Sequence, residues 1–100
     1  MTPLIISPEA EADLDDIWLY IAKESQSVER AGHFLDRFAV FFTLLTENPY
    51  MGRARDDLRR GYCSFPIGNY LVIYRGWDDD EVLILRVIRG SRDIQTLLPE

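Results

Sequence analysis

Apolar residues recur with a helical period near the start of the chain. They fall at Ala10, Leu14, Ile17, Trp18 and Ile21, which lie on one stripe of an amphipathic helix. Ser7 comes just before this stripe and can cap free backbone N–H groups, while Pro8 fits the first helical position. The apolar run Leu4–Ile6 precedes the cap. The pattern therefore predicts a short strand followed by a helix that begins at Pro8.

A second helix is predicted from about Val28 to Thr46. Its apolar stripe consists of Ala31, Phe34 or Leu35, Phe38, Phe42 and Leu45. The Ser-Gln-Ser segment at 25–27 interrupts the first helix and offers a cap for the second. The second helix should end before Asn48-Pro49, because a proline disfavours helix in the residue before it. A link this short makes the two helices an antiparallel hairpin.

Strand-like runs fill the second half of the chain, after a loop from Tyr50 to Gly61. These runs are Tyr62–Phe65, Tyr70–Trp77 and Val82–Ile88, with turns predicted at Gly68-Asn69 and at Asp78-Asp79-Asp80. The last run is apolar on both faces, which favours a central strand. The predicted order is β-α-α-β-β-β. We therefore expect an α+β fold with a mostly antiparallel sheet and the N-terminal helical hairpin packed on one face.

Composition and charge limit the number of domains and the classes of partner that we expect. One hundred residues, 47% of them hydrophobic, predict a single domain over residues 1–100 and exclude a disordered segment. The net charge is −6, with nine acids and three bases in residues 1–50 and eight of each in residues 51–100. This balance argues against coating nucleic acid by bulk charge, and no direct sequence-specific nucleic-acid binding is expected. No leader-like or membrane-spanning run is recognised, so we expect a cytoplasmic protein without membrane contact.

Few residues offer catalytic or metal chemistry. Cys63 is the single cysteine and His33 the single histidine, so a nucleophilic pair would form only if the two met in space. The alternatives are a core thiol and a surface histidine. The acidic run at 78–81 lacks the spacing of a calcium-binding loop. We therefore predict no catalytic residue, no metal site and no cofactor.

Arginines are the more informative polar residues. Ten of the eleven basic residues are arginine, and eight of these follow residue 50. Arg86, Arg89 and Arg92 run along the last predicted strand and just beyond it. A regular strand would place Arg86 and Arg89 on opposite faces, whereas Gly90 could gather Arg89 and Arg92 on one edge. Such arginines suit an acidic partner or a nucleic-acid backbone, or else they pair internally, as Arg92 could with Asp93. The spacing leaves both alternatives open.

The second helix is unusually broad in its apolar character. From Phe38 to Leu45 only Thr43 is polar, so the helix needs cover on more than one side. The sheet and first helix supply one side. The other side is either an exposed patch or a seat for a partner, and we favour a partner. That partner could be another copy of the chain or a different protein.

Several segments together resemble one known family, the ParE-type toxins. In order they are SPEAEADL (7–14), IWLYIA (17–22), NPYMGR (48–53), RDDLR (55–59), FPIGNYLVIYR (65–75) and VIRGSRDI (87–94). The resemblance covers nearly the whole chain and implies the RelE/ParE-like fold expected above. It also implies the toxin half of a type II toxin–antitoxin pair, often encoded on plasmids or in bacterial chromosomes. A small ParD-like antitoxin, whose tail wraps the toxin, would neutralise it.

The resemblance also implies two alternative activities, because the two branches of the superfamily act on different targets. The best-known ParE-type toxins poison DNA gyrase, whereas the related RelE-type toxins cut mRNA on the ribosome. RelE-like sequences typically carry an arginine where this chain has Leu71, and the tail after Asp93 has no tyrosine. His33 lies outside the matching segments. These departures favour a non-catalytic gyrase inhibitor. A ribosome-dependent endoribonuclease and a partner-binding homologue without toxicity remain the alternatives.

Site residues follow as expectations. We expect the target, DNA gyrase, to contact Arg86, Arg89 and Arg92. We expect the antitoxin to place apolar residues on the second helix and acids opposite the arginine-rich loop. The corresponding residues are Phe38, Phe41, Leu44, Leu45, Arg53, Arg55, Arg59 and Arg60. A higher-order toxin–antitoxin oligomer is compatible with this arrangement.

Overall fold

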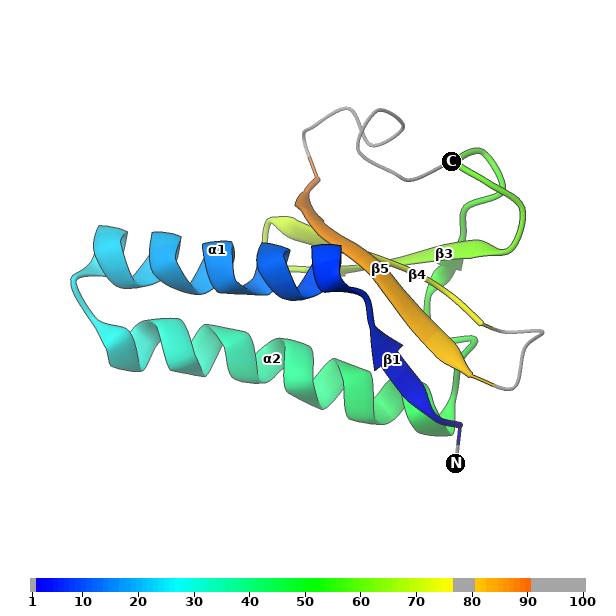
Figure 1. Ribbon diagram of the computed structural model, residues 1–100, viewed down its shortest axis with the longest axis horizontal. Coiled ribbons are helices and arrows are strands. Elements are labelled where there is room, and N and C mark those ends of the chain that lie inside the picture. The colour runs from blue at the N-terminus through cyan, green and yellow to red at the C-terminus, as the bar shows by residue number, and fades with distance from the viewer. Residues whose placement is uncertain (1, 77–80, 91–100) are drawn as a thin grey trace.

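The computed structural model describes residues 2–76 and 81–90 and has the predicted order of elements with one addition (Figure 1). The elements are β1 (Leu4–Ile6), α1 (Pro8–Ser25), α2 (Val28–Glu47), β2 (Arg53–Ala54), β3 (Tyr62–Ile67), β4 (Tyr70–Arg75) and β5 (Val82–Arg89). The addition is β2, which lies in the segment predicted as a loop. Within the described residues, neither helix combines the length and apolar character needed to cross a bilayer. The acidic turn at 78–80, Trp77 and Arg92 lie outside the described residues.

The five strands form one sheet in the order β1-β5-β4-β3-β2. Only the β1–β5 pair is parallel, with Leu4 opposite Val82, and the other three pairs are antiparallel. The last strand is internal, between β1 and β4, as its two apolar faces predicted. Gly68 has a φ of 59° in the β3–β4 turn, which confirms the hairpin predicted at Gly68-Asn69. The mostly antiparallel α+β fold is thus confirmed.

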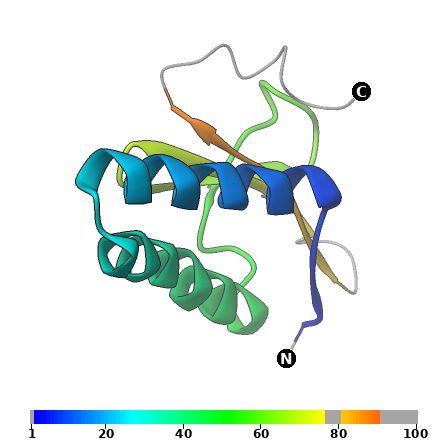
Figure 2. The ribbon, with the colours of Figure 1, turned by 60° about the vertical axis from the view of Figure 1, so that its left-hand side comes forward.

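Two serine caps fix where the helices begin. The Ser7 hydroxyl accepts a hydrogen bond from the Ala10 N–H at 3.0 Å and donates to the Leu85 carbonyl at 2.9 Å. The Ser27 hydroxyl accepts from the Arg30 N–H at 3.1 Å. Both caps satisfy donors that would otherwise lack a partner. Because Ser7 also bonds to β5, the first helix leaves the sheet edge in a fixed direction (Figure 2).

The main core lies between the helical hairpin and the sheet. Its largest fully buried side chains are those of Tyr74, Phe38 and Leu45. A smaller cluster covers the opposite face of the sheet, where Ile73 and Leu85 pack with Leu58 from the loop before β3. This second cluster explains why the last strand is apolar on both faces. The predicted packing of the hairpin on one face is confirmed, and the loop covers part of the other.

Candidate functional site

An open apolar groove runs between α2 and β3. It has a volume of about 360 Å³ and is lined by Asp36, Arg37, Val40, Phe41, Leu44, Met51, Phe65, Pro66 and Ile67. Val40 and Leu44 lie one helical turn apart and remain 60% and 43% exposed. The floor of the groove is well packed, because the Phe41 and Phe65 rings stack with centroids 4.3 Å apart. We call this site the α2–β3 groove.

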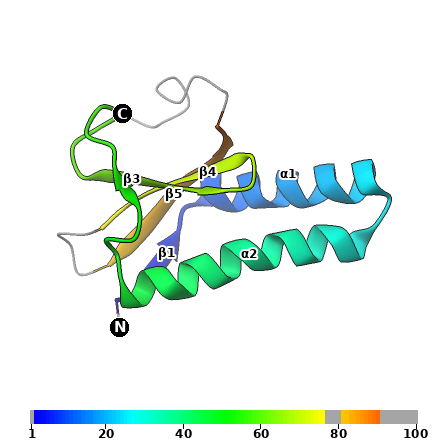
Figure 3. The ribbon, with the colours of Figure 1, turned by 180° about the vertical axis from the view of Figure 1, so that it is seen from behind.

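The edge of the sheet leaves this groove open. The two-residue strand β2 pairs only with Ser64 and Cys63 of β3. On that side of β3, Phe65 to Ile67 have no strand partner among the described residues, while on the other side they pair with β4. Seen from behind, the chain leaves the end of α2, rises beside the sheet and loops back into β3 (Figure 3). The exposed edge and the exposed ridge of α2 therefore face the same groove.

A buried tyrosine holds the segment that supplies Met51. The Tyr74 hydroxyl accepts a hydrogen bond from the Gly52 N–H at 2.8 Å and donates to the Pro49 carbonyl at 3.1 Å. These two bonds bracket Met51 and fix it on the groove wall. Burial raises the pKa of Tyr74 to about 12, because the phenolate would lose its hydration. This anchor has no sequence signal, since the two segments are more than twenty residues apart.

The structure divides the apolar residues predicted to bind the antitoxin. Phe41 and Leu44 line the α2–β3 groove, where Leu44 is 43% exposed and Phe41, at 3%, belongs to the floor. Phe38 and Leu45 are only 1% and 0% exposed, so the structure corrects their placement on a contact surface. They point into the core because they lie on the stripe of α2 that faces the sheet. They support the groove from beneath and cannot contact a partner while the chain is folded.

The arginines predicted for the same seat lie elsewhere. None of Arg53, Arg55, Arg59 and Arg60 lines the groove, and their loop packs through Leu58 on the face away from the helices. Arg55 binds both carboxylate oxygens of Asp57 at 3.0 Å, and this pairing raises the pKa of Arg55 and lowers that of Asp57. The other three are exposed. The groove's own cation is Arg37, whose guanidinium lies 5.2 Å from the Phe34 ring.

Arg86 is bound within the fold. The Asp13 carboxylate accepts hydrogen bonds from Arg86 Nε at 2.7 Å, from Arg86 Nη2 at 3.0 Å and from the Val87 N–H at 2.9 Å. The pair is mostly buried, with side-chain exposures of 14% for Asp13 and 21% for Arg86. The hydrogen bonds that Arg86 donates to the Asp13 carboxylate are the main reason that the pKa of Arg86 is raised. Internal pairing, one of the two alternatives left open, therefore applies to Arg86.

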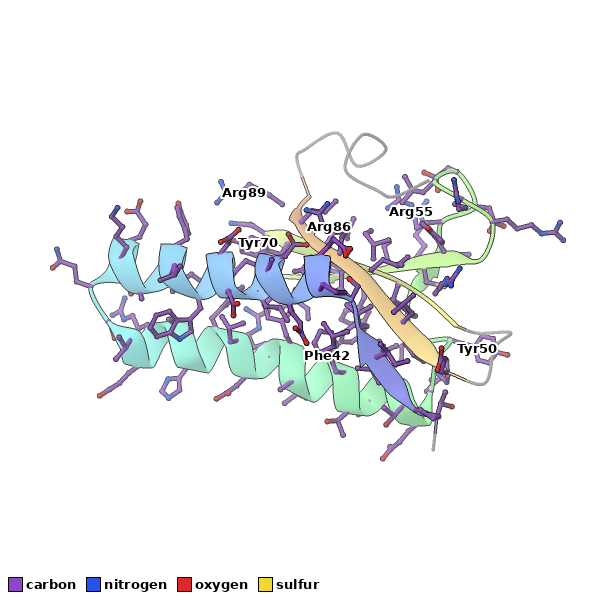
Figure 4. All side chains as sticks on the ribbon, in the orientation of Figure 1. Phe42, Tyr50, Arg55, Tyr70, Arg86 and Arg89 are labelled. Carbon is purple, nitrogen blue, oxygen red and sulfur yellow. The ribbon has the colours of Figure 1, made fainter. Side chains whose placement is uncertain are left out.

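Arg89 is exposed and lies against two tyrosines. Its guanidinium carbon is 5.4 Å from the Tyr20 ring centroid and 5.9 Å from that of Tyr70, and the two side chains raise its pKa. Figure 4 shows Arg86, Arg89 and Tyr70 on the α1 side of the molecule, apart from Arg55. Arg86 and Arg89 line one cleft of about 420 Å³ together with Asp13, Asp16, Ile17, Tyr20, Tyr70, Val87 and Ile88. We call it the Arg89 cleft.

The pairing of β5 with β4 is regular from Arg86 to Arg89, which is the alternation expected from their odd spacing. Ile73 of β4 pairs with Arg86, but the next residue, Tyr74, pairs with Ile84. This shift leaves Leu85 as an extra residue in β5, which is a β-bulge. The bulge precedes Arg86, so it leaves the alternation of side chains from Arg86 to Arg89 unchanged, although both arginines line one cleft.

The candidate nucleophile pair does not form. Cys63 is buried in β3, where burial raises the pKa of its thiol, while His33 is exposed on α2. Among residues 2–76 and 81–90, no three His, Cys, Asp or Glu side chains gather as metal ligands. The described surface thus presents two grooves suited to partners, one apolar and one charged.

Comparisons with known proteins place this chain in one family. A family model described as "ParE toxin of type II toxin-antitoxin system, parDE" matches residues 4–94. Toxin ParE1 of Caulobacter vibrioides is 34% identical over 98 residues, which are 98% of this chain and 99% of that toxin. Toxin ParE3 of the same organism is 31% identical over 98% of this chain and 96% of its own length. Toxin ParE1 of Mycobacterium tuberculosis is 28% identical over 90% of this chain and 91% of its own length.

The fold is found in a solved structure as well. A chain from the chromosomal ParDE TA system of P. aeruginosa superposes with a TM-score of 0.74 at 22% identity, covering 89% of this chain and 96% of that one. The protein belongs to the ParE toxin family of type II toxin–antitoxin systems.

Proposed function

We propose that this chain is a toxin that binds and inhibits DNA gyrase in the cytoplasm, and that a cognate ParD-like antitoxin neutralises it by occupying the α2–β3 groove. Membership of the ParE family supports the toxin role. The observation that carries the antitoxin seat is the groove itself, where Val40 and Leu44 stay exposed beside an edge of β3 that lacks a strand partner among residues 2–76 and 81–90. Exposed apolar surface of this kind on a small protein marks a site for a partner.

The groove sets the chemistry of the segment that fits it. An amphipathic segment can place apolar side chains on Val40, Leu44 and Phe65. Asp36 and Arg37 lie on the same wall with opposite charges, so they fix the direction of the bound segment. Acids of the antitoxin would then face Arg37 first. The exposed arginines of the loop before β3 would contribute only where the antitoxin continues over the sheet.

Two matched valines test the antitoxin seat. Val40 and Val28 both lie on α2 and are 60% and 62% exposed, but only Val40 lines the groove. Calorimetric titration with the antitoxin encoded beside this gene should give a dissociation constant raised about 100-fold by Val40→Asp, since a buried carboxylate would lack a partner. Val28→Asp should leave it within about threefold. Equal effects of the two substitutions would show that the antitoxin binds elsewhere.

Supercoiling of relaxed plasmid by purified gyrase tests the target. We expect the purified chain to inhibit supercoiling, and the cognate antitoxin to restore it. Unchanged supercoiling with folded chain would refute the gyrase assignment. New codon-specific ends in primer extension after induction would favour the endoribonuclease alternative. Normal growth with soluble, folded protein in the cell would favour a homologue that has lost toxicity.

A further inference from the structure

Four charged side chains line the Arg89 cleft, and only two of them form an ion pair among the described residues. Arg86 and Asp13 neutralise each other in its floor. Arg89 and Asp16 also line the cleft, are exposed, and make no ion pair among the described residues. The cleft therefore offers one cation and one anion to a partner.

The surroundings of Arg89 are pre-arranged. Its guanidinium lies against Tyr20 from α1 and Tyr70 from β4, and these contacts restrict the long side chain before anything binds. Tyr20 is 48% exposed. Arg89 and Tyr70 also line a neighbouring cleft of about 390 Å³ at the β3–β4 turn. The two side chains therefore separate this cleft from the Arg89 cleft. Tyrosine and arginine are the residue types that dominate binding energy at protein interfaces, and pre-ordering lowers the entropy lost on binding.

The charge pattern favours a protein over a nucleic acid. A phosphate backbone gains affinity from several unpaired cations that track its charges. Here Arg89 is the single unpaired cation of the described cleft, and Asp16 would repel a polyanion. A protein segment can instead present a carboxylate to Arg89 and a basic side chain to Asp16.

We propose that Tyr20, Arg89, Tyr70 and Asp16 form a second docking site, separate from the antitoxin groove, for a protein segment that carries a carboxylate next to a basic side chain. In the setting of the proposed function, this segment belongs to the toxin's target. The carboxylate accepts charge-assisted hydrogen bonds from the Arg89 guanidinium, while an aliphatic or aromatic part of the segment packs on Tyr20. The inference rests on the proposed function only for the identity of that target.

Two pairs of matched variants test the site. Arg89→Gln is compared with Arg75→Gln, because both arginines are exposed at the ends of neighbouring strands and only Arg89 lines the cleft. Asp16→Lys is compared with Asp15→Lys, because adjacent helical positions face different directions and only Asp16 lines the cleft. All four proteins are first checked for native circular dichroism and for unchanged antitoxin affinity, which establishes folding independently of the target.

The readouts are gyrase inhibition and growth arrest on induction. Arg89→Gln should raise the inhibitory concentration about 30-fold or more, and Asp16→Lys about 10-fold, whereas Arg75→Gln and Asp15→Lys should stay within about threefold. If the wild-type chain inhibits gyrase and Arg89→Gln inhibits equally, the docking site is wrong and the proposed function stands.

Growth arrest separates the site from the identity of the target. If the wild-type chain leaves gyrase unaffected, the gyrase assignment fails and growth arrest in the same variants decides the site. Loss of arrest in Arg89→Gln and Asp16→Lys alone supports the site. Arrest by all variants alike, or no arrest by the wild type, overturns it.

Discussion

Removal of the Asp13 carboxylate tests the account of how α1 is joined to the sheet. In Asp13→Ala, the Arg86 guanidinium and the Val87 N–H lose the acceptor that now binds them at 2.7 to 3.0 Å. Breaking a fully buried ion pair costs about 3–5 kcal/mol, and losing a hydrogen bond to a charged group about 1.5–3 kcal/mol. The pair keeps 14% and 21% side-chain exposure, so water compensates in part. We therefore expect Asp13→Ala to lower the free energy of unfolding by about 2–3 kcal/mol.

Urea unfolding followed by far-ultraviolet circular dichroism measures this loss. With an m value of about 1.5 kcal/mol/M, the midpoint should fall by about 1.3–2 M. Asp15→Ala is the matched control, because it removes an exposed acid from the same helix and should change stability by less than about 0.5 kcal/mol. Equal midpoints for the two variants would refute the reasoning.

A second substitution identifies the source of the loss. Arg86→Met in the Asp13→Ala background replaces the unpaired guanidinium with an apolar chain of similar length. The double variant should regain about 1 kcal/mol or more over Asp13→Ala, because it no longer leaves a partly buried charge without a partner. A double variant that is no more stable would locate the loss in the backbone bond to Val87.

Three further predictions concern the loop anchor and the core. Gly52→Ala should lose about 1–3 kcal/mol of stability in urea unfolding, since its Cβ would meet the Tyr74 hydroxyl and lie 2.8 Å from the Ser64 carbonyl, whereas Gly32→Ala, with open space, should gain up to about 1 kcal/mol. The pKa of Tyr74, raised from 10.0 to about 12, means that stability is lost as pH rises through this window; ultraviolet titration should show one late phenolate, absent in Tyr74→Phe. The Cys63 thiol, whose pKa burial raises, should react with iodoacetamide more than about tenfold slower in the folded than in the urea-unfolded chain, and equal rates would contradict its burial.

Local signals were enough to predict most elements of the fold. The β1 strand, the start of α1 at Pro8 and the start of α2 at Val28 are confirmed, because caps and apolar periods act over a few residues. β2 was missed because a two-residue strand has no period of its own. Its position follows from the pairing of Arg53 and Ala54 with β3, which lies about ten residues further along.

The candidate sites were predicted less completely, because their geometry depends on long-range pairing. The bond between Asp13 and Arg86 joins residues 73 positions apart, and no spacing rule reaches that far. The bulge at Leu85 reverses the face expected for every side chain after it. The broad apolar surface of α2 did predict a seat, but the choice between the buried Leu45 and the exposed Leu44 needed the sheet in place.

Two acidic residues of the first half of the chain have specific structural positions. The net charge of −6 arises in residues 1–50, which carry nine acids and three bases. Asp13 holds β5 through three hydrogen bonds, and Asp16 lines the Arg89 cleft. The acids of α1 therefore include one that builds the fold and one that shapes a candidate interface.

Trapping of gyrase on DNA tests the central claim most directly. Purified gyrase and supercoiled plasmid are incubated with the purified chain, the reaction is stopped with detergent and protease, and the fraction of linear plasmid is measured. A toxin that inhibits gyrase by holding it on cleaved DNA should raise this fraction in a dose-dependent way, and the cognate antitoxin should return it to the level of gyrase alone. An unchanged linear fraction, at concentrations where the same preparation binds its antitoxin and arrests growth, would contradict the account.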